Sequence, residues 1–262
     1  ITYKILDFPD LTVDGSFPLG AAVAASMMVG GHSPFLATLM AMVSGALSGS
    51  ITGVLNTKAK ISHLLSGILT MTSLYSINLR IMGRPNIALL NQPTVFSWME
   101  ELLNKFMPDF PAKHLNLVFF IVIALCIKVL LDTFLQTQLG LSLRATGDNP
   151  QMIRSQGVNT DVSNIIGLAL SNSLVALSGA LVAQYQGFAD VSMGVGAMVA
   201  SLASVIIGDT LLGERSLFFS TLGVLVGSFI YRFSISLVLS FRLAEASDLR
   251  LLTSIVVIIA LT

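Results

Sequence analysis

Residues 144–159 read RATGDNPQMIRSQGVN and lie between two long apolar segments. Asn149 is suited to cap a helix N-terminus, and Pro150 fits the first helical position. Asp148 places an acceptor at the positive end of this helix, and Gly157 supplies a stop. About two turns of helix lie between cap and stop, too short to be stable alone in water; they comprise Gln151, Met152, Ile153, Arg154, Ser155 and Gln156. We therefore expect another surface to hold this loop.

The composition of the whole chain is that of a membrane protein. Of 262 residues, 54% are hydrophobic and 11% are charged, against roughly 25% charged in soluble domains. The mean hydropathy is +0.83. The net charge is zero and Lys and Arg are scattered, so we expect no nucleic-acid partner. Cys126 is the single cysteine, which excludes a disulfide within the chain.

Apolar runs long enough to cross a bilayer recur along the chain, at 34–55, 61–79, 115–135, 162–184 and 217–241, with a last run from 251. Two shorter runs, 16–30 and 194–207, each cover roughly 22 Å as helices, less than the bilayer core of ~30 Å. The sequence predicts an all-α integral membrane protein, a polytopic transmembrane helix bundle with two half helices. We expect residues 1–262 to form a single transmembrane domain whose two ends are cut within helices, the first near Leu6.

The two short runs resemble each other. FPDLTV at 8–13 precedes the first and FADVSM at 188–193 precedes the second, and GAAVAA from Gly20 and GAMVAS from Gly196 follow. An odd number of crossings between the copies would invert the second one, as in transporters whose broken helices meet near the bilayer midplane. The sequence therefore predicts an inverted repeat, with chance similarity of two apolar stretches as the alternative.

Polar residues at the two half-helix starts are candidates for a translocation pathway, since free N–H groups at such starts suit a substrate carboxylate. They are Asp10, Thr12, Asp14 and Ser16 at the first start, and Asp190 and Ser192 at the second. Asp and Thr before an apolar run are also ordinary helix caps. Capping and substrate contact are both open on the sequence alone.

Two further patterns concern packing. Gly45, Gly49 and Gly53 recur every four residues, a spacing that lets helix backbones approach closely in lipid. The polar insert around Trp98 has an amphipathic pattern, which predicts a helix lying in the membrane interface. Nucleotide-binding and hydrolase motifs are absent from the sequence, and its histidines are isolated. We expect no catalytic residue, no metal site and no cofactor in this chain.

The segment LRATGDNPQMIRSQGVN, residues 143–159, resembles the coupling-helix region of bacterial ABC importer permeases of the branched-chain amino acid and ribose class. KILDFPDLTVDGSFPLGAAVAA, residues 4–25, is similar to the family's early segment, in which a helix ends and a Gly/Ala-rich helix begins. GVGAMVASLASVIIGDTLLGERS, residues 194–216, resembles its later Gly/Ala-rich segment. The closest resemblance is to permeases that accompany a lipoprotein-type binding protein and are often linked to aromatic amino acids such as tryptophan.

The resemblance implies that loop 144–159 is cytoplasmic and docks in a cleft of an ATP-binding-cassette ATPase subunit. Met152 and Ile153 would then form an apolar knob within a polar rim. The full set of ATPase-coupling candidates is Asp148, Asn149, Pro150, Met152, Ile153, Arg154, Gln156 and Gly157. With this loop inside, Lys58 and Lys60 are also inside, and the insert around Trp98 is outside.

The resemblance also implies a homodimer in the bacterial cytoplasmic (inner) membrane, multi-pass in each copy. Two ATPase subunits would bind ATP and Mg, and an extracytoplasmic substrate-binding protein would deliver a small solute, foremost an amino acid. A sugar or nucleoside is the alternative solute. The rival class is an ion-coupled secondary transporter in which intramembrane aspartates, Asp10, Asp14 or Asp190, carry the ion.

Overall fold

The structure is a computed structural model that describes residues 1–90, 92–106, 112–213 and 216–240. It divides into two compact units. Unit 1 consists of Ile1–Leu125 and Leu135–Val195, and unit 2 of Cys126–Phe134 together with the chain from Gly196 onward. The apolar run predicted from residue 251 lies outside the described residues.

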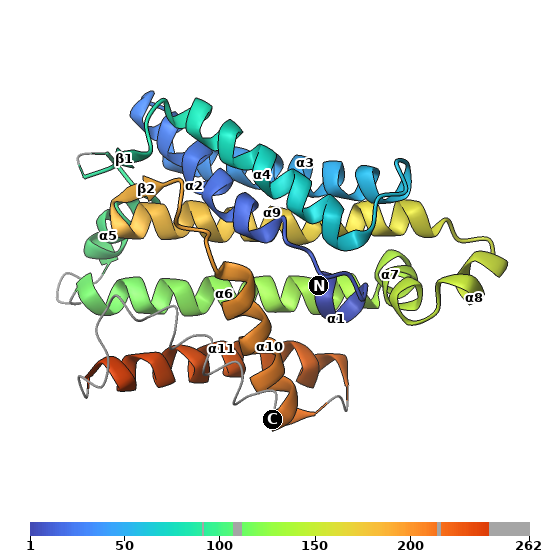
Figure 1. The fold of residues 1–262 in the computed structure, drawn as a ribbon. Coiled ribbons are helices and arrows are strands. Elements are labelled where there is room, and N and C mark those ends of the chain that lie inside the picture. Colours follow the sequence, from blue (N-terminus) through green and yellow to red (C-terminus); the bar gives the residue numbers. More distant parts are fainter. Residues whose placement is uncertain (91, 107–111, 214–215, 241–262) are drawn as a thin grey trace. The chain divides into compact units, whose positions relative to one another are not determined.

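Unit 1 is built from helices and one pair of short strands (Figure 1). In chain order these are α1 (Thr2–Ile5), α2 (Val13–Val29), α3 (Pro34–Thr57), α4 (His63–Met82), β1 (Asn86–Ala88), α5 (Val95–Phe106), the first half of α6 (Ala112–Gln136), α7 (Gln138–Asp148), α8 (Pro150–Ser155), α9 (Thr160–Gln186) and β2 (Phe188–Asp190). Unit 2 contains the segment 126–134 of α6 together with α10 (Ala197–Leu212) and α11 (Leu217–Ser240).

Four helices in the described part of the chain are long and apolar enough to cross a membrane: Pro34–Thr57, Asn116–Gln136, Thr160–Gln186 and Leu217–Leu237. Each coincides with a predicted run. The predicted run 61–79 forms α4, which is 20 residues long but lies outside this set. The two predicted half helices are also confirmed as short apolar helices, α2 with 17 residues and α10 with 16. The chain is therefore a polytopic helical membrane protein.

Small residues bring α2, α3 and α9 of unit 1 into close backbone contact. A Cβ atom added to Gly45 would lie 2.4 Å from the carbonyl oxygen of Asn172, and one added to Gly49 would lie 2.2 Å from that of Leu168. On α2, a Cβ at Gly20 would lie 1.9 Å from the carbonyl oxygen of Ala176. No larger residue fits these positions without moving a helix backbone. The predicted packing role of the α3 glycines is confirmed.

A small sheet was not predicted from the sequence. β1 pairs antiparallel with β2, with Asn86 opposite Asp190 and Ala88 opposite Phe188. Between them Ile87 and Ala189 face the core, with 4% and 0% of their surface exposed. The FADVSM motif therefore begins as a strand, and each strand is only three residues long. Such short strands carry too little alternation to stand out within a helical sequence.

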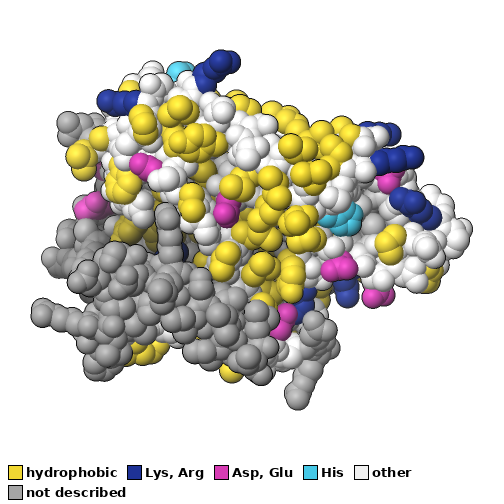
Figure 2. All heavy atoms as spheres, viewed as in Figure 1, with side chains coloured by type: hydrophobic (Ala, Val, Ile, Leu, Met, Phe, Trp, Pro, Cys, Tyr) yellow, Lys and Arg dark blue, Asp and Glu magenta, His cyan; other side chains and the backbone are white. Residues whose placement is uncertain are grey.

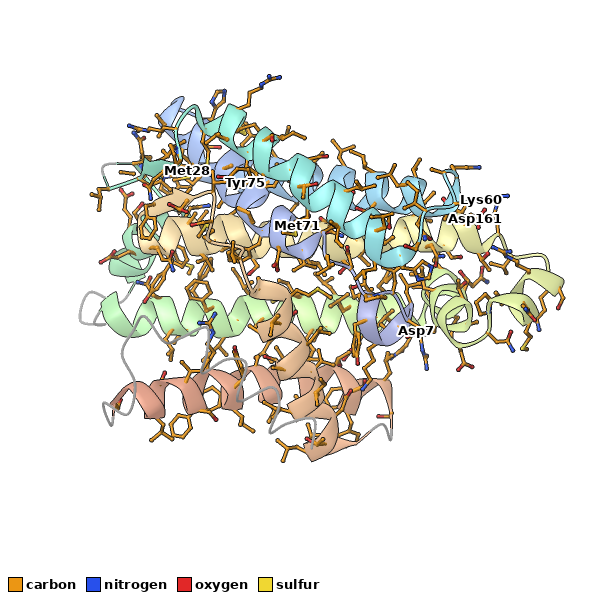
Figure 3. All side chains as sticks on the ribbon, viewed as in Figure 1. Asp7, Met28, Lys60, Met71, Tyr75 and Asp161 are labelled. Carbon is orange, nitrogen blue, oxygen red and sulfur yellow. The ribbon has the colours of Figure 1, made fainter. Side chains whose placement is uncertain are left out.

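The two ends of α9 mark two polar ends of unit 1. At its start, Asp161 lies at the same end as Asp7 and Lys60 (Figure 3). Near its finish, the Gln184 side chain donates to Thr38 at 2.8 Å and accepts from the amide of Val95 at 3.0 Å. Hydrophobic side chains gather on the visible surface between charged ends (Figure 2). Lys60 and α5, which carries Trp98, lie at opposite ends of unit 1 (Figures 1 and 3). Which of these ends faces the cytoplasm stays a prediction.

The predicted amphipathic insert is the helix α5. Its Phe96 is 7% exposed and packs against a cluster of aromatic rings, namely Phe119 at 5.0 Å, Phe120 at 5.3 Å and Tyr185 at 5.8 Å between ring centroids. Trp98 is 47% exposed. One face of α5 is thus anchored on unit 1 while the indole stays accessible, as expected of a helix at an interface. The side chains from residue 102 to the end of α5 lie outside the described residues.

Candidate functional site

The loop quoted first contains the short helix α8, and its predicted cap and stop are confirmed. The Asn149 side chain accepts a hydrogen bond from the Met152 amide at 3.0 Å, and Pro150 occupies the first helical position. Gly157, with φ +88°, follows the helix in the left-handed conformation that glycine tolerates best. Asp148 is the last residue of α7, a helix that was not predicted from the sequence. Residues 144–148 are therefore helical.

The apolar surface of α8 is narrower than predicted. Met152 is 57% exposed, whereas Ile153 is 8% exposed and packs against its own chain. The prediction that both residues form an outward apolar knob is wrong for Ile153. Ile153 therefore holds α8 on unit 1, and Met152 is the apolar side chain of α8 that stays accessible. Asp148 and Gln156 are exposed, as predicted.

Arg154 has partners within its own chain. Its Nε atom donates to the hydroxyl of Thr160, and its terminal nitrogen lies 3.1 Å from the Asp161 carboxylate. Both acceptors belong to the first turn of α9, where Asn159 provides the N-cap. Arg154 thus connects α8 to the first turn of α9. The sequence predicted Arg154 as a rim contact for a partner. Its side chain is 62% exposed, and this role stays a prediction beside the internal contact.

A polar cavity of about 710 Å³ adjoins α8 within unit 1. It is lined from the α3–α4 turn, the α1–α2 connection, α7 and the start of α9. Two of its residues, Asp7 and Lys60, have φ angles of 50° and 56°, a conformation uncommon outside glycine. Figure 3 places both at the end that carries Asp161. The α8 region is therefore one face of a larger polar end built from four segments.

The break between α1 and α2 is held by a buried aspartate. Asp10 is 3% exposed, and its carboxylate accepts from the Thr12 amide at 2.9 Å and from the Asn172 side-chain amide at 2.7 Å. Thr12 is the N-cap of α2 but makes no side-chain capping bond. Thr12 thus occupies the predicted cap position without a capping bond from its side chain, and Asp10 lies two residues before it. Asp10 instead joins the start of α2 to the middle of α9.

Hydroxyl groups extend this contact into a buried network. Ser16 donates to Asn172 at 2.7 Å and shares a hydrogen bond of 2.9 Å with Ser48. The Thr12 and Thr52 hydroxyls lie 2.8 Å apart, and Thr52 donates to Thr70 at 2.9 Å. The network therefore links α2, α3, α4 and α9. Hydrogen bonding is what makes burial of these polar groups tolerable.

The members of this network on α3, α4 and α9 were not predicted from the sequence. On α3, Ser48 and Thr52 each directly precede one of the predicted glycines, Gly49 and Gly53, so they lie beside these glycines on the helix surface. That pattern could have placed them at the same interface. Asn172 is a polar residue within a predicted membrane span, which by itself predicts that its side chain faces protein rather than lipid. Which of these residues it would contact required the structure.

The segment before the second half helix, α10, is held differently from the start of α2. Asp190 is half-buried and accepts from the Ser192 amide at 2.7 Å and from the Ser192 hydroxyl. Asn86 also donates to it, at 3.3 Å, and the Ser192 hydroxyl is the main cause that lowers the pKa of this carboxyl. α10 begins only after Gly196 and has no side-chain cap. The prediction that Asp190 or Ser192 caps the second half helix is therefore wrong.

The two predicted motifs nevertheless meet in unit 1. A Cβ atom added to Gly194 would lie 2.2 Å from the carbonyl oxygen of Asp14 in the first turn of α2. The segment after β2 therefore packs closely on the start of α2. Asp10, Thr12 and Ser16 come together in one network, and Asp190 and Ser192 bond to each other. Whether these residues line a translocation pathway stays a prediction.

Comparison with known proteins identifies the family. The sequence model for the branched-chain amino acid transport system, permease component, matches residues 1–261. The chain belongs to this permease family. A tyrosine transport system permease protein of Clostridioides difficile is 47% identical over 258 residues, which cover 98% of this permease and 82% of the relative. A ribose import permease protein of Haemophilus influenzae is 28% identical, covering 86% and 67% respectively. No solved structure matches this permease.

The family assignment agrees with the architecture of the permease. The match runs through both units, including the loop that carries α8 and both half helices. A protein of Rickettsia prowazekii that is 36% identical also matches over the full chain, covering 90% of its own length. The resemblance drawn from the loop and the two Gly/Ala-rich segments is thereby confirmed. The chain is the membrane-spanning permease component of an ABC-type transport system.

Proposed function

We propose that this permease is the translocating subunit of an ATP-binding-cassette importer for an amino acid, with an aromatic amino acid such as tyrosine as the first candidate. The observation that carries the proposal is the α8 helix. It is capped by Asn149, tied to α9 through Arg154, and presents Met152 to the outside. A rigid helix with one accessible apolar side chain suits docking into a cleft of another subunit. The solute is suggested by the name of the relative from Clostridioides difficile.

ATPase subunits would bind at the polar end that carries α8, which places this end in the cytoplasm. They bind ATP and Mg, and their closure shifts the permease between inward-open and outward-open states. An extracytoplasmic binding protein would deliver the solute at the opposite end, where β1, β2 and α5 lie. Two copies of the permease would form the pathway together in the bacterial cytoplasmic membrane. The chain itself supplies no covalent step.

The translocation pathway would pass the two half-helix starts. Asp190 and Ser192 are accessible in unit 1 and suit the first contact with a delivered solute. Asp14 lies in the first turn of α2, the turn on which the segment containing Gly194 packs. Asp10, Thr12 and Ser16 are buried, so they would act on the pathway by holding α2 in position.

Capture of the ATPase subunit tests the role of α8. The permease is purified with its candidate ATPase as wild type and as Met152→Asp, which places a charge at the accessible apolar position. Leu90→Asp is the matched control because Leu90 is 83% exposed and follows β1 at the opposite end. We expect Met152→Asp to lose roughly tenfold or more in ATPase affinity, as for a central interface anchor. Equal capture by both variants would contradict docking on α8.

Uptake into proteoliposomes separates the transport classes and the solutes. With ATP inside and the binding protein outside, labelled tyrosine is expected to accumulate without an ion gradient. Uptake that follows a proton or sodium gradient and needs no ATPase would replace the proposal with a secondary transporter. Labelled ribose is the second solute, because a more distant relative is a ribose import permease. ATP-dependent uptake of ribose but not tyrosine would keep the importer and change its solute class.

A further inference from the structure

Two opposite charges lie within the apolar helix α6. Lys128 and Asp132 are spaced by one helical turn and their side chains form an ion pair of 2.5 Å. The candidate span Asn116–Gln136 has a mean hydropathy of 2.5 in its most apolar window. Lys128 lies only about 3 Å along the axis from the middle of this span. Charged residues at such a depth are rare and face protein or a water-filled cavity.

The pair is covered by the start of α11, in unit 2. The Thr221 hydroxyl donates to the second carboxylate oxygen of Asp132 at 2.7 Å. The Lys128 ammonium lies 3.6 Å from the centre of the Phe218 ring, within the range of a cation–π interaction. Side-chain exposure is 6% for Lys128 and 13% for Asp132. Both charges are therefore directed at one patch of α11, one turn long.

Insertion into a membrane does not require such a pair. Well-packed apolar residues of similar volume commonly serve as well as a buried ion pair or better, whereas one unpaired charge is strongly unfavourable. The pair instead sets the orientation of α6 about its own axis, because only one rotation brings both charges into contact with Thr221 and Phe218. Lys128 and Asp132 thus fix both the face and the register of the contact between α6 and α11.

We propose that Lys128, Asp132 and Thr221 form an intramembrane latch that makes the 126–134 segment of α6 and the start of α11 move as one body during transport. This inference rests on the proposed importer function. α6 ends at Gln136, α7 follows from Gln138, and α8 begins at Pro150, so only two short connections separate the latch from the ATPase-docking helix along the chain. A displacement of α8 on ATP binding would reach α11 through α6. The three residues are positioning residues for translocation.

The test measures solute taken up per ATP hydrolysed in proteoliposomes that contain the full transporter. Thr221→Val keeps the ion pair and removes the bond to α11. Thr133→Val is the matched control. Among the described residues, the Thr133 hydroxyl bonds only to carbonyl groups of its own helix, at Val129 and Leu130. We expect Thr221→Val to lower uptake per ATP roughly tenfold, the factor for a hydrogen bond to a charged group, with assembly retained. The control is expected to match wild type.

The double variant Lys128→Met with Asp132→Leu tests whether the ion pair is needed for transport or only for insertion of α6 into the membrane. It leaves no unpaired charge, so we expect assembly and ATP hydrolysis to persist. Uptake per ATP is expected to be below that of wild type, as in Thr221→Val. Wild-type uptake per ATP in this variant or in Thr221→Val would overturn the latch. Absence of ATP-driven uptake in the wild type would instead refute the proposed function, so the two failures are distinguishable.

Discussion

The two half helices begin from similar sequences but are held in different ways. FPDLTV places Asp10 in the interior, where its carboxylate bonds to Thr12 and to Asn172 of α9. FADVSM places Asp190 at the edge of a strand, where it bonds to Ser192 and Asn86 and remains half accessible. The shared feature is local, an aspartate that accepts the amide two residues later. The difference comes from the neighbouring helix, because only Asp10 meets a buried amide donor.

The two aspartates therefore have different roles in the same fold. An acceptor whose partners are buried is costly to remove, since the partners lose their hydrogen bonds and cannot reach water. An accessible acceptor can be replaced by water at little cost. We therefore expect Asp10 to act on stability and on the position of α2, and Asp190 to act on the exposed surface.

Asp10→Ala is expected to have the largest effect. It removes the two hydrogen bonds that the Asp10 carboxyl group accepts, and it leaves the Asn172 amide buried without that partner. The expected loss is about 3 kcal/mol in the free energy of unfolding. Denaturation in mixed detergent micelles measures it.

Asp190→Ala is the matched control for this prediction, because it deletes the same side chain from the similar motif. Its loss is expected to be much smaller, since water can reach Asn86 and Ser192. Equal losses in the two variants would show that burial does not distinguish the motifs. Asn172→Leu, which deletes the donor instead, is expected to destabilise the permease as Asp10→Ala does.

The sequence predicted the helices well because membrane spans are set by length and apolarity, which are local properties. The α8 cap was predictable for the same reason, since Asn149, Pro150 and Gly157 act within one short segment. The partners of Asp10 were not predictable, because they depend on the register of α9 against α2. Ile153 was misjudged on similar grounds, because its burial against its own chain depends on contacts that a loop sequence alone does not reveal. The contact of Arg154 with α9 was not predicted for the same reason.

Thr52→Val is expected to have an intermediate effect. Thr52 connects Thr12 of α2 to Thr70 of α4, and valine keeps its shape while removing both hydroxyl contacts. The expected loss is about 1 kcal/mol in the free energy of unfolding. Thr57→Val serves as the control, because the Thr57 hydroxyl bonds to Gly53 in its own helix. A control as destabilised as Thr52→Val would mean that the network adds nothing beyond local helix contacts.

The smallest expected effect concerns the pH response of Asp190. Donation from the Ser192 hydroxyl lowers the pKa of this carboxyl below its unfolded value of about 3.9. The ionised form therefore stabilises the folded state above that value, and the contribution disappears as pH falls through the lowered pKa. Thermal unfolding of wild type and Asp190→Asn at a series of pH values checks this. The wild type is expected to melt higher at neutral pH, with the gap closing in acid. Ser192→Ala removes the main cause of the pKa shift. We therefore expect the difference in melting temperature between Ser192→Ala and the double variant Ser192→Ala with Asp190→Asn to be smaller than that between wild type and Asp190→Asn. Equal differences would assign the pKa shift to a group other than Ser192.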